Sequence, residues 1–223
     1  MSAKLRAFFF DLDGTVLNTV DMIVDSFKVA CAAIDHEVST EQIKSGIGMT
    51  MEEFVPKLLG DRLAEKEQFL DSYFGYQRDF GNSTITVFNE ILPLLKMLKE
   101  KSIPMGVVTS RRRDSALELC ENLGLLSFFD VFVCAGEASR NKPFGDPLLL
   151  ALYKLNEIYS DDEFEHIKPD ECVYFGDAIH DIEAASDANF MSVLVDWSKV
   201  DRVRSEEMAD LVYKEAQDIE KYI

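Results

Sequence analysis

Short apolar runs recur along the chain with helical patterns between them, and this alternation is the strongest constraint on the fold. The runs lie at residues 5–11, 103–109, 131–135, 172–177 and 192–196, with a further candidate at 209–214. Each contains a stretch of consecutive apolar residues, which is typical of strands covered on both faces. Buried strands that alternate with helices predict an α/β fold built on a parallel sheet, of the Rossmann-like kind.

The interval 17–83 has a different pattern. One face of a helix is outlined by apolar residues at spacings of four, three and four: Ile23, Phe27, Ala30 and Ile34. The segments 39–42 (STEQ) and 50–53 (TMEE) fit the capping box that begins a helix. We expect no strand here. The prediction is an all-helical insert at 17–83, placed between the first strand and the rest of a Rossmann-like core formed by residues 1–16 and 84–223.

Composition excludes some classes of function. The chain has 223 residues, of which 47% are hydrophobic, enough for a substantial core. Its formal charge of -18 argues against a nucleic-acid-binding surface, which needs a basic patch. The same charge repels anionic substrates, so a phosphate ligand would need a local metal, lysine or helix N-terminus.

No apolar run is long enough for a signal peptide or a membrane span, so we expect no membrane partner. The four cysteines are scattered, without a CxxC pair or a histidine cluster. They suggest neither a zinc site nor a disulfide framework, and the expectation is a reduced, cytoplasmic protein.

The stretch FFFDLDGT places two carboxylates at the end of the first apolar run. Asp11 and Asp13 are two residues apart, so they project to the same side of an extended strand, and Gly14 allows a sharp turn. Two carboxylates this close are unfavourable without a cation or a shared proton. Solvated turn residues are the simpler interpretation of "DG" alone, but the full string is much more specific.

Other polar residues follow the ends of later apolar runs. Thr109, Ser110 and Arg111 follow one, and Asp177 and Asp181 follow another. In open parallel sheets ligands bind outside the carboxyl ends of the strands, so these segments should converge. Taken singly, Thr109 could equally be a helix N-cap and Asp181 a first-turn aspartate.

Lys142, in NKPFGDP, precedes a proline in a loop before a helix. A lone loop lysine is usually solvated. Near three carboxylates, however, it would offset their repulsion and meet an anionic substrate. Two glycines in the helical insert, Gly46 and Gly48, indicate either a loop that reaches over this site or an ordinary turn between helices.

In order and spacing, DLDGTVLNT, VVTSR, KPFGDP and GDAIHDIEAA resemble the four motifs of the haloacid dehalogenase-like phosphohydrolase superfamily. The helical insert after the first motif is similar to the family's alpha-helical cap. VVTSRRRDS and the segment after it most resemble the phosphoglycolate phosphatase and pyrophosphatase branch. Asn189 stands at a frequent glycine position and can adopt the same left-handed conformation.

The resemblance implies a role for each matching residue. Asp11 would be the nucleophile that forms an aspartyl-phosphate, and Asp13 the general acid and then the base. The charge of Asp11 and partial burial are expected to favour a proton on Asp13. Thr109 would hydrogen-bond the transferred phosphoryl group and Lys142 would neutralise it.

The resemblance also implies a Mg²⁺ cofactor. Its ligands would be Asp11, the backbone carbonyl of Asp13, and Asp177, with Asp181 supporting the site from outside the ligand set. Magnesium prefers a few hard oxygen ligands and retains waters, which agrees with this set. Ser110 and Arg111 are further candidates for substrate binding, together with Thr109 and Lys142.

The resulting prediction is a Mg-dependent phosphatase that acts on a small phosphorylated metabolite, a phosphoglycolate-like monoester or pyrophosphate. A β-phosphoglucomutase-like phosphosugar mutase shares the motifs and the cap, and the motifs do not separate the two. A non-catalytic phosphate-binding module is a third possibility. It usually lacks a catalytic position, whereas Asp11, Asp13, Lys142 and Asp177 are all present here.

Overall fold

The computed structural model describes residues 4–160, 165–200 and 202–223 and contains a six-stranded parallel sheet in the order β5-β4-β1-β6-β7-β8. The strands are β1 (Ala7–Phe10), β4 (Met105–Val108), β5 (Val131–Val133), β6 (Cys172–Gly176), β7 (Met191–Val195) and β8 (Leu211–Tyr213). Each predicted run contributes one strand. The Rossmann-like α/β prediction is therefore confirmed.

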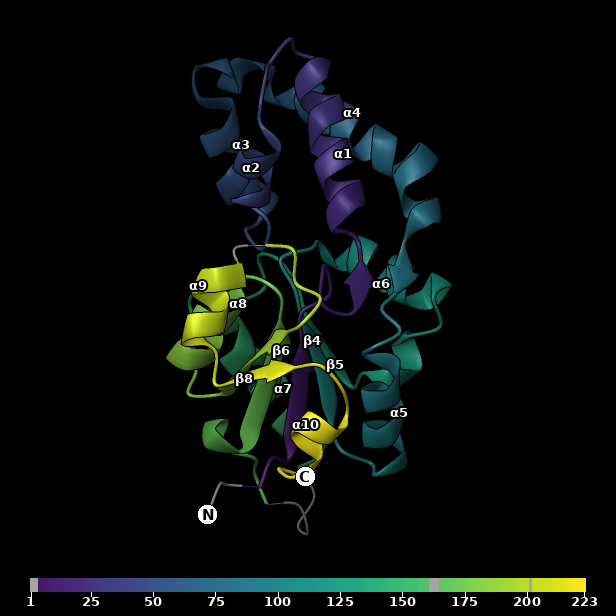
Figure 1. Ribbon diagram of the computed structural model, residues 1–223, viewed down its shortest axis with the longest axis vertical. Helices are drawn as coiled ribbons and strands as arrows, with labels where there is room; N and C mark the ends of the chain where they lie inside the picture. Colours follow the sequence, from purple (N-terminus) through teal and green to yellow (C-terminus); the bar gives the residue numbers. More distant parts are fainter. Residues whose placement is uncertain (1–3, 161–164, 201) are drawn as a thin grey trace.

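Helices follow the strands and cover both faces of the sheet (Figure 1). The helices of this part of the chain are α5 (Leu92–Glu100), α6 (Arg113–Asn122), α7 (Asp146–Ile158), α8 (Ile179–Asp187), α9 (Arg202–Met208) and α10 (Gln217–Glu220), with short 3-10 turns η4 (Leu126–Phe128) and η5 (Pro169–Glu171).

The central strand β1 shows why continuous apolar runs were needed. Phe8 and Phe10 belong to one apolar cluster, and Phe10 stacks on Phe175 of the neighbouring strand at a centroid distance of 4.9 Å. Phe9 points to the opposite face, into a separate cluster with Leu152 of α7 and Phe190. Alternate side chains of a strand point to opposite faces, so both must be apolar when both are covered.

A helical segment lies between two very short strands. β2 (Leu17–Asn18) pairs antiparallel with β3 (Thr86–Val87), so the chain leaves and re-enters the sheet domain side by side. The elements between them are α1 (Val20–Ala32), α2 (Thr40–Lys44), α3 (Met51–Leu59), η1 (Gly60–Glu65), α4 (Lys66–Tyr76), η2 (Gln77–Gly81) and η3 (Asn82–Thr84).

The expectation of no strand in 17–83 is wrong at Leu17–Asn18. A two-residue strand has no hydrophobic period of its own, and β2 exists because Thr86–Val87 lies beside it. Both predicted capping boxes are confirmed, at Ser39 with Gln42 and at Thr50 with Glu53.

The helical segment packs around Phe27 of α1. Its ring lies 5.2 Å from that of Phe54 on α3, and 5.9 Å and 4.8 Å from those of Phe69 and Tyr73 on α4. Figure 1 shows α1, α3 and α4 beyond the carboxyl ends of the sheet strands. Within the described ranges, no helix combines the length and apolar character needed to cross a bilayer.

Candidate active site

Three neighbouring strands bring the predicted site residues together. Asp11 follows β1, Thr109 follows β4 and Asp177 follows β6, and β1 lies between the other two. All three side chains are buried. The sharp turn after Asp11 uses Gly14, whose φ is +81°. A side chain there would lie 2.2 Å from an oxygen of Asp177, so only glycine fits without displacing that carboxylate.

Lys142 lies at the centre of the site, with all three donors of its ammonium group occupied. Nζ donates to Asp11 Oδ1 at 2.7 Å, to Asp181 Oδ1 at 2.6 Å and to the hydroxyl of Tyr174 at 3.0 Å. Burial alone would lower the pKa of Lys142, but the charges of Asp11 and Asp181 outweigh it and raise the pKa well above the usual value. The lysine therefore stays charged.

Asp181 has structural partners on both oxygens. Oδ1 accepts from Lys142, and Oδ2 accepts from the backbone N–H groups of Asp177 at 3.2 Å and Ala178 at 3.0 Å. A Cβ at Gly176 would lie 2.1 Å from Asp181 Cβ, so glycine is required for the carboxylate to fold back onto the loop. Asp181 thus orients both Lys142 and the segment that carries Asp177.

The donor set suits a hard divalent cation. Carboxylate oxygens of Asp11, Asp177 and Asp181 lie within 4.8 Å of one another, and Asp177 Oδ2 is buried without a hydrogen-bond partner. Burial, together with the charge of Asp181, raises the pKa of Asp11 to about 7 despite Lys142. Burial and the charges of Asp181 and Asp11 raise the pKa of Asp177 well above its usual value. A cation here would satisfy the orphaned oxygen and relieve the repulsion.

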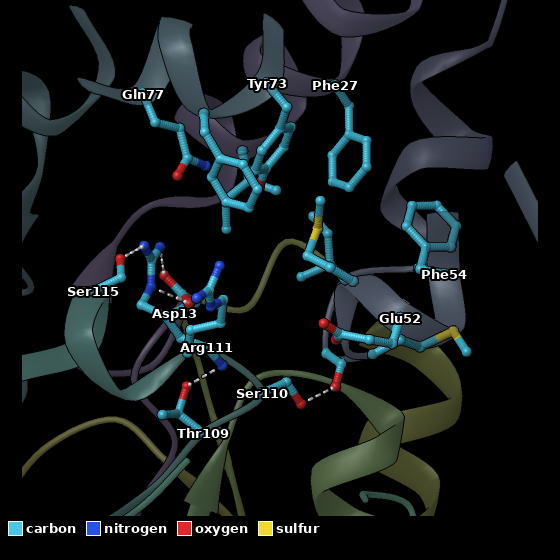
Figure 2. A pocket seen from close by; sticks show the side chains of 18 of the residues that line it. Asp13, Phe27, Glu52, Phe54, Tyr73, Gln77, Thr109, Ser110, Arg111 and Ser115 are labelled. Atoms are coloured by element: carbon cyan, nitrogen blue, oxygen red, sulfur yellow. Dashed lines mark hydrogen bonds and ion pairs between the residues drawn. The ribbon is translucent and has the colours of Figure 1, made fainter. Parts of the chain in front are cut away.

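Asp13 forms a bidentate ion pair with Arg111 (Figure 2). Nε donates to Oδ2 at 2.9 Å and Nη2 to Oδ1 at 2.6 Å, and Nη1 donates to Ser115 Oγ at 2.9 Å. Burial raises the pKa of Asp13, but the charge and hydrogen bonds of Arg111 outweigh it, and the pKa is lowered. The expectation that burial and Asp11 favour a proton on Asp13 is therefore wrong in this conformation.

Thr109 and Ser110 have partners within the protein. Thr109 Oγ1 accepts from the backbone N–H of Arg111 at 3.2 Å, which leaves its hydroxyl hydrogen to donate elsewhere. Ser110, predicted as a substrate-binding residue, donates to the backbone carbonyl of Gly48 at 2.6 Å. Ser110 therefore joins the sheet domain to the helical segment.

The Gly46–Gly48 loop does reach over the site. Gly48 has φ +95°, and a Cβ there would lie 3.2 Å from that of Ala178, so the loop approaches the strand ends closely. Asn141, beside Lys142, donates to Glu53 Oε1 of α3 at 3.1 Å. The helical segment is thus docked on the carboxyl ends of the strands.

A cavity of about 100 Å³ lies between the two parts. Its floor includes Asp11, Asp13, Thr109 and Arg111. Its roof comes from the helical segment and is mostly apolar: Ile23, Phe27, Ile47, Met49, Met51, Phe54, Tyr73 and Phe74. Figure 2 shows Phe27, Tyr73 and Gln77 on the side opposite Thr109 and Ser110.

Sequence reasoning missed several of these residues. Tyr174 lies within a buried strand run, and its hydroxyl both accepts from Lys142 and donates to the carbonyl of Val108 at 2.7 Å. Tyr73 and Gln77 are helical positions with no motif. A buried tyrosine hydroxyl usually has a hydrogen-bond partner, so the position of Tyr174 in an apolar strand run was the one sequence feature that pointed to a polar group nearby.

Comparison with known proteins agrees with this geometry. The model of the family described as "Haloacid dehalogenase-like hydrolase" matches residues 8–195. The chain belongs to this family. Pyrophosphatase PpaX of Bacillus pumilus is 30% identical over 222 residues, which cover 97% of this chain and 95% of that protein. The chain is a hydrolase of the family's phosphatase branch.

Solved structures share the fold. A hydrolase from Pseudomonas syringae has a TM-score of 0.78 at 25% identity and covers 96% of this chain and 95% of its own. The β-phosphoglucomutase of Clostridium difficile has a TM-score of 0.75 at 22% identity, with coverage of 97% and 93%. At 22% identity the second likeness shows the architecture, which mutases and phosphatases share.

Proposed function

We propose that this protein is a magnesium-dependent phosphatase that hydrolyses a small phosphorylated metabolite through an aspartyl-phosphate on Asp11. The observation that carries the proposal is the position of Asp11. Its Oδ1 accepts a hydrogen bond from Lys142 at 2.7 Å, and its carboxylate lies within 4.8 Å of that of Asp177, whose Oδ2 is buried without a hydrogen-bond partner. A carboxylate that attacks an anion needs this cationic shielding.

Each residue has a distinct part in the proposed reaction. Asp11 attacks phosphorus, and its place at the end of the rigid strand β1 fixes the direction of attack. Lys142 offsets the charge of the phosphoryl oxygens, and the free hydroxyl hydrogen of Thr109 donates to one of them. Asp11, Asp177 and the backbone carbonyl of Asp13 would hold Mg²⁺, which neutralises further phosphoryl charge when bound.

Asp13 transfers protons in this scheme. It donates to the leaving-group oxygen and later accepts a proton from the water that cleaves the acyl phosphate. Its carboxylate must first leave Arg111, which holds both oxygens in this conformation. We propose that residues 17–83 act as the cap over the core of residues 1–16 and 84–223. The Ser110–Gly48 hydrogen bond holds the two together and limits entry of water.

The size of the cavity supports a small substrate. Pockets for drug-sized ligands usually measure roughly 300–1,000 Å³, and the cavity here, about 100 Å³, is smaller. This favours compact substrates such as phosphoglycolate or pyrophosphate, and the PpaX relatives are named as pyrophosphatases. A hexose bisphosphate is larger than either, so the docked cap favours hydrolysis of a small ester over a sugar mutase.

We propose that the protein works in the cytoplasm on a free metabolite, without nucleic-acid or membrane partners. All four cysteines are unpaired and buried. Unpaired thiols are typical of a reducing compartment. The formal charge of -18 opposes binding to polyanions.

Phosphate release from a panel of phosphoglycolate, pyrophosphate and small phosphomonoesters, with Mg²⁺ or with EDTA, tests the proposal. We expect Mg-dependent release that Asp11→Asn abolishes while the circular dichroism spectrum is unchanged. Turnover of none of the panel, or full activity of Asp11→Asn, contradicts it. Conversion of β-glucose 1-phosphate to its 6-phosphate with little free phosphate would identify the mutase instead.

A further inference from the structure

We propose that Arg111 exchanges Asp13 for a second anionic group of the substrate, so that the site selects phosphoesters whose leaving group carries its own negative charge. The inference rests on the proposed phosphatase function and names the substrate class for that site. Arg111 is then a specificity-determining residue whose guanidinium has two alternative anionic partners.

The first observation is the bidentate pairing of Asp13 with Arg111. Arg111 occupies both oxygens of its carboxylate, at 2.9 Å and 2.6 Å, and a third donor of the guanidinium is fixed by Ser115. The pair is largely withdrawn from solvent, with side-chain exposures of 8% for Arg111 and 18% for Asp13. In this state the guanidinium engages one lone pair on each oxygen and holds the Asp13 carboxylate toward Arg111, so the pair must open before Asp13 can turn to a leaving-group oxygen.

The second observation is the scarcity of other cations. Lys142 has all three donors engaged below the cavity. Among the described residues that line the cavity, the cationic side chains are Arg111 and Arg112, and Arg112 is exposed. The roof is mostly apolar, and an anion buried against it without a cation would be costly. A charged leaving group therefore has one buried partner available.

The consequence differs between two classes of leaving group. A carboxylate or second phosphate takes the guanidinium from Asp13, so Arg111 keeps an anionic partner and Asp13 is released toward the scissile oxygen. A neutral leaving group must open the buried pair without replacing either partner, and breaking such a pair is unfavourable. Because Arg111 and Asp13 line the same cavity as Asp11, the exchange needs only side-chain movement.

The test compares phosphoglycolate with ethyl phosphate, which has a similar length and lacks the carboxylate. The variants are Arg111→Met, Arg111→Lys and, as a matched control, Arg113→Met. Arg113 pairs with Glu137 at the surface and does not line the cavity. All are assayed for kcat/KM with Mg²⁺ and checked for folding by thermal unfolding.

We expect the wild type to prefer phosphoglycolate by about 10- to 100-fold, the range expected for one charged hydrogen-bonded partner. Arg111→Met should lose that preference, with kcat/KM for phosphoglycolate falling and that for ethyl phosphate rising as Asp13 is released. Arg111→Lys should keep part of the preference, and Arg113→Met all of it. Calorimetric titration should show that Asp11→Asn binds phosphoglycolate, and that adding Arg111→Met to this variant weakens the affinity at least about tenfold.

Equal losses on both substrates in Arg111→Met would show that Arg111 only positions Asp13, and would overturn the inference. A wild type that hydrolyses both esters equally well would also overturn it while leaving the phosphatase function intact. A wild type that hydrolyses neither, nor any other ester, removes the proposed function and the inference together.

Discussion

Replacing Lys142 with methionine should destabilise the protein strongly at neutral pH without metal. The ammonium group donates to Asp11, Asp181 and Tyr174, and its side chain is 2% exposed. Methionine has a similar length and no charge, so the variant leaves two buried carboxylates facing each other. The repulsion between these two carboxylates and the cost of their desolvation raise the free energy of the folded state only, because both are solvated in the unfolded chain.

Removing one partner of a buried ion pair costs about 3–5 kcal/mol, a large part of the stability of an ordinary domain. For a chain of this size that is a drop in Tm of about 6–20 °C. Lys154→Met is the matched control, because its pair with Glu137 has 37% and 22% exposed side chains. A surface pair of this kind contributes about 0.2–1 kcal/mol.

Urea unfolding of both variants at pH 8 in EDTA measures the difference. Adding Asp11→Asn to Lys142→Met should recover part of the loss, because it removes one of the two opposed charges. At pH 6 the loss from Lys142→Met should be smaller, since Asp11, with a pKa near 7, is then more protonated. A loss below about 1 kcal/mol, equal to that of Lys154→Met, would refute the reasoning.

Three further predictions concern the metal, the turn after β1 and the loop of the helical segment that lies over the site. The pKa of Asp11 is about 7 in the folded, metal-free protein and 3.8 in the unfolded chain. Protonation of Asp11 therefore stabilises the metal-free fold at low pH, and this stabilisation is lost as the pH rises through 7. Mg²⁺ binds the ionised form of Asp11, so adding Mg²⁺ should raise Tm more at pH 8 than at pH 6. Gly14→Ala should abolish that increase, whereas Gly124→Ala, also at positive φ but in open space, should not. Gly48→Ala should lower kcat/KM about tenfold, measured with the best panel substrate, by moving the loop from Ala178.

Each of these has a clear contrary result. If Mg²⁺ raises Tm equally at both pH values, Asp11 is not a ligand of the metal. Equal metal responses in Gly14→Ala and Gly124→Ala would mean that the turn does not shape the site. Unchanged kinetics in Gly48→Ala would mean that the close approach of this loop has no part in turnover.

The sheet could be predicted because its signal is local. All four residues of β1, Ala7–Phe10, are apolar and buried, and the neighbouring strands β4 and β6 are also buried throughout. Asp11, Thr109 and Asp177 could be placed together since parallel strands share one carboxyl edge. The left-handed backbone of Asn189, φ 58°, was also expected from its residue type.

The remaining features depend on contacts between distant residues. Arg111 and Asp13 are 98 positions apart, and nothing local indicates that they pair. The β2–β3 ribbon and the Ser110–Gly48 hydrogen bond likewise exist only once the two parts of the chain meet. Sequence patterns specify elements and shared edges, whereas side-chain pairing across a cavity follows from tertiary packing.

The charges of the site explain how so acidic a chain can hold an anion. When all four are ionised, the carboxylates Asp11, Asp13, Asp177 and Asp181 carry two more charges than Lys142 and Arg111 offset. A divalent cation cancels that excess, and the site then has no net charge that would repel a phosphoryl dianion. The metal would therefore complete the site's charge balance, and for this reason it should bind before the substrate, whose approach the remaining acidic surface opposes at long range.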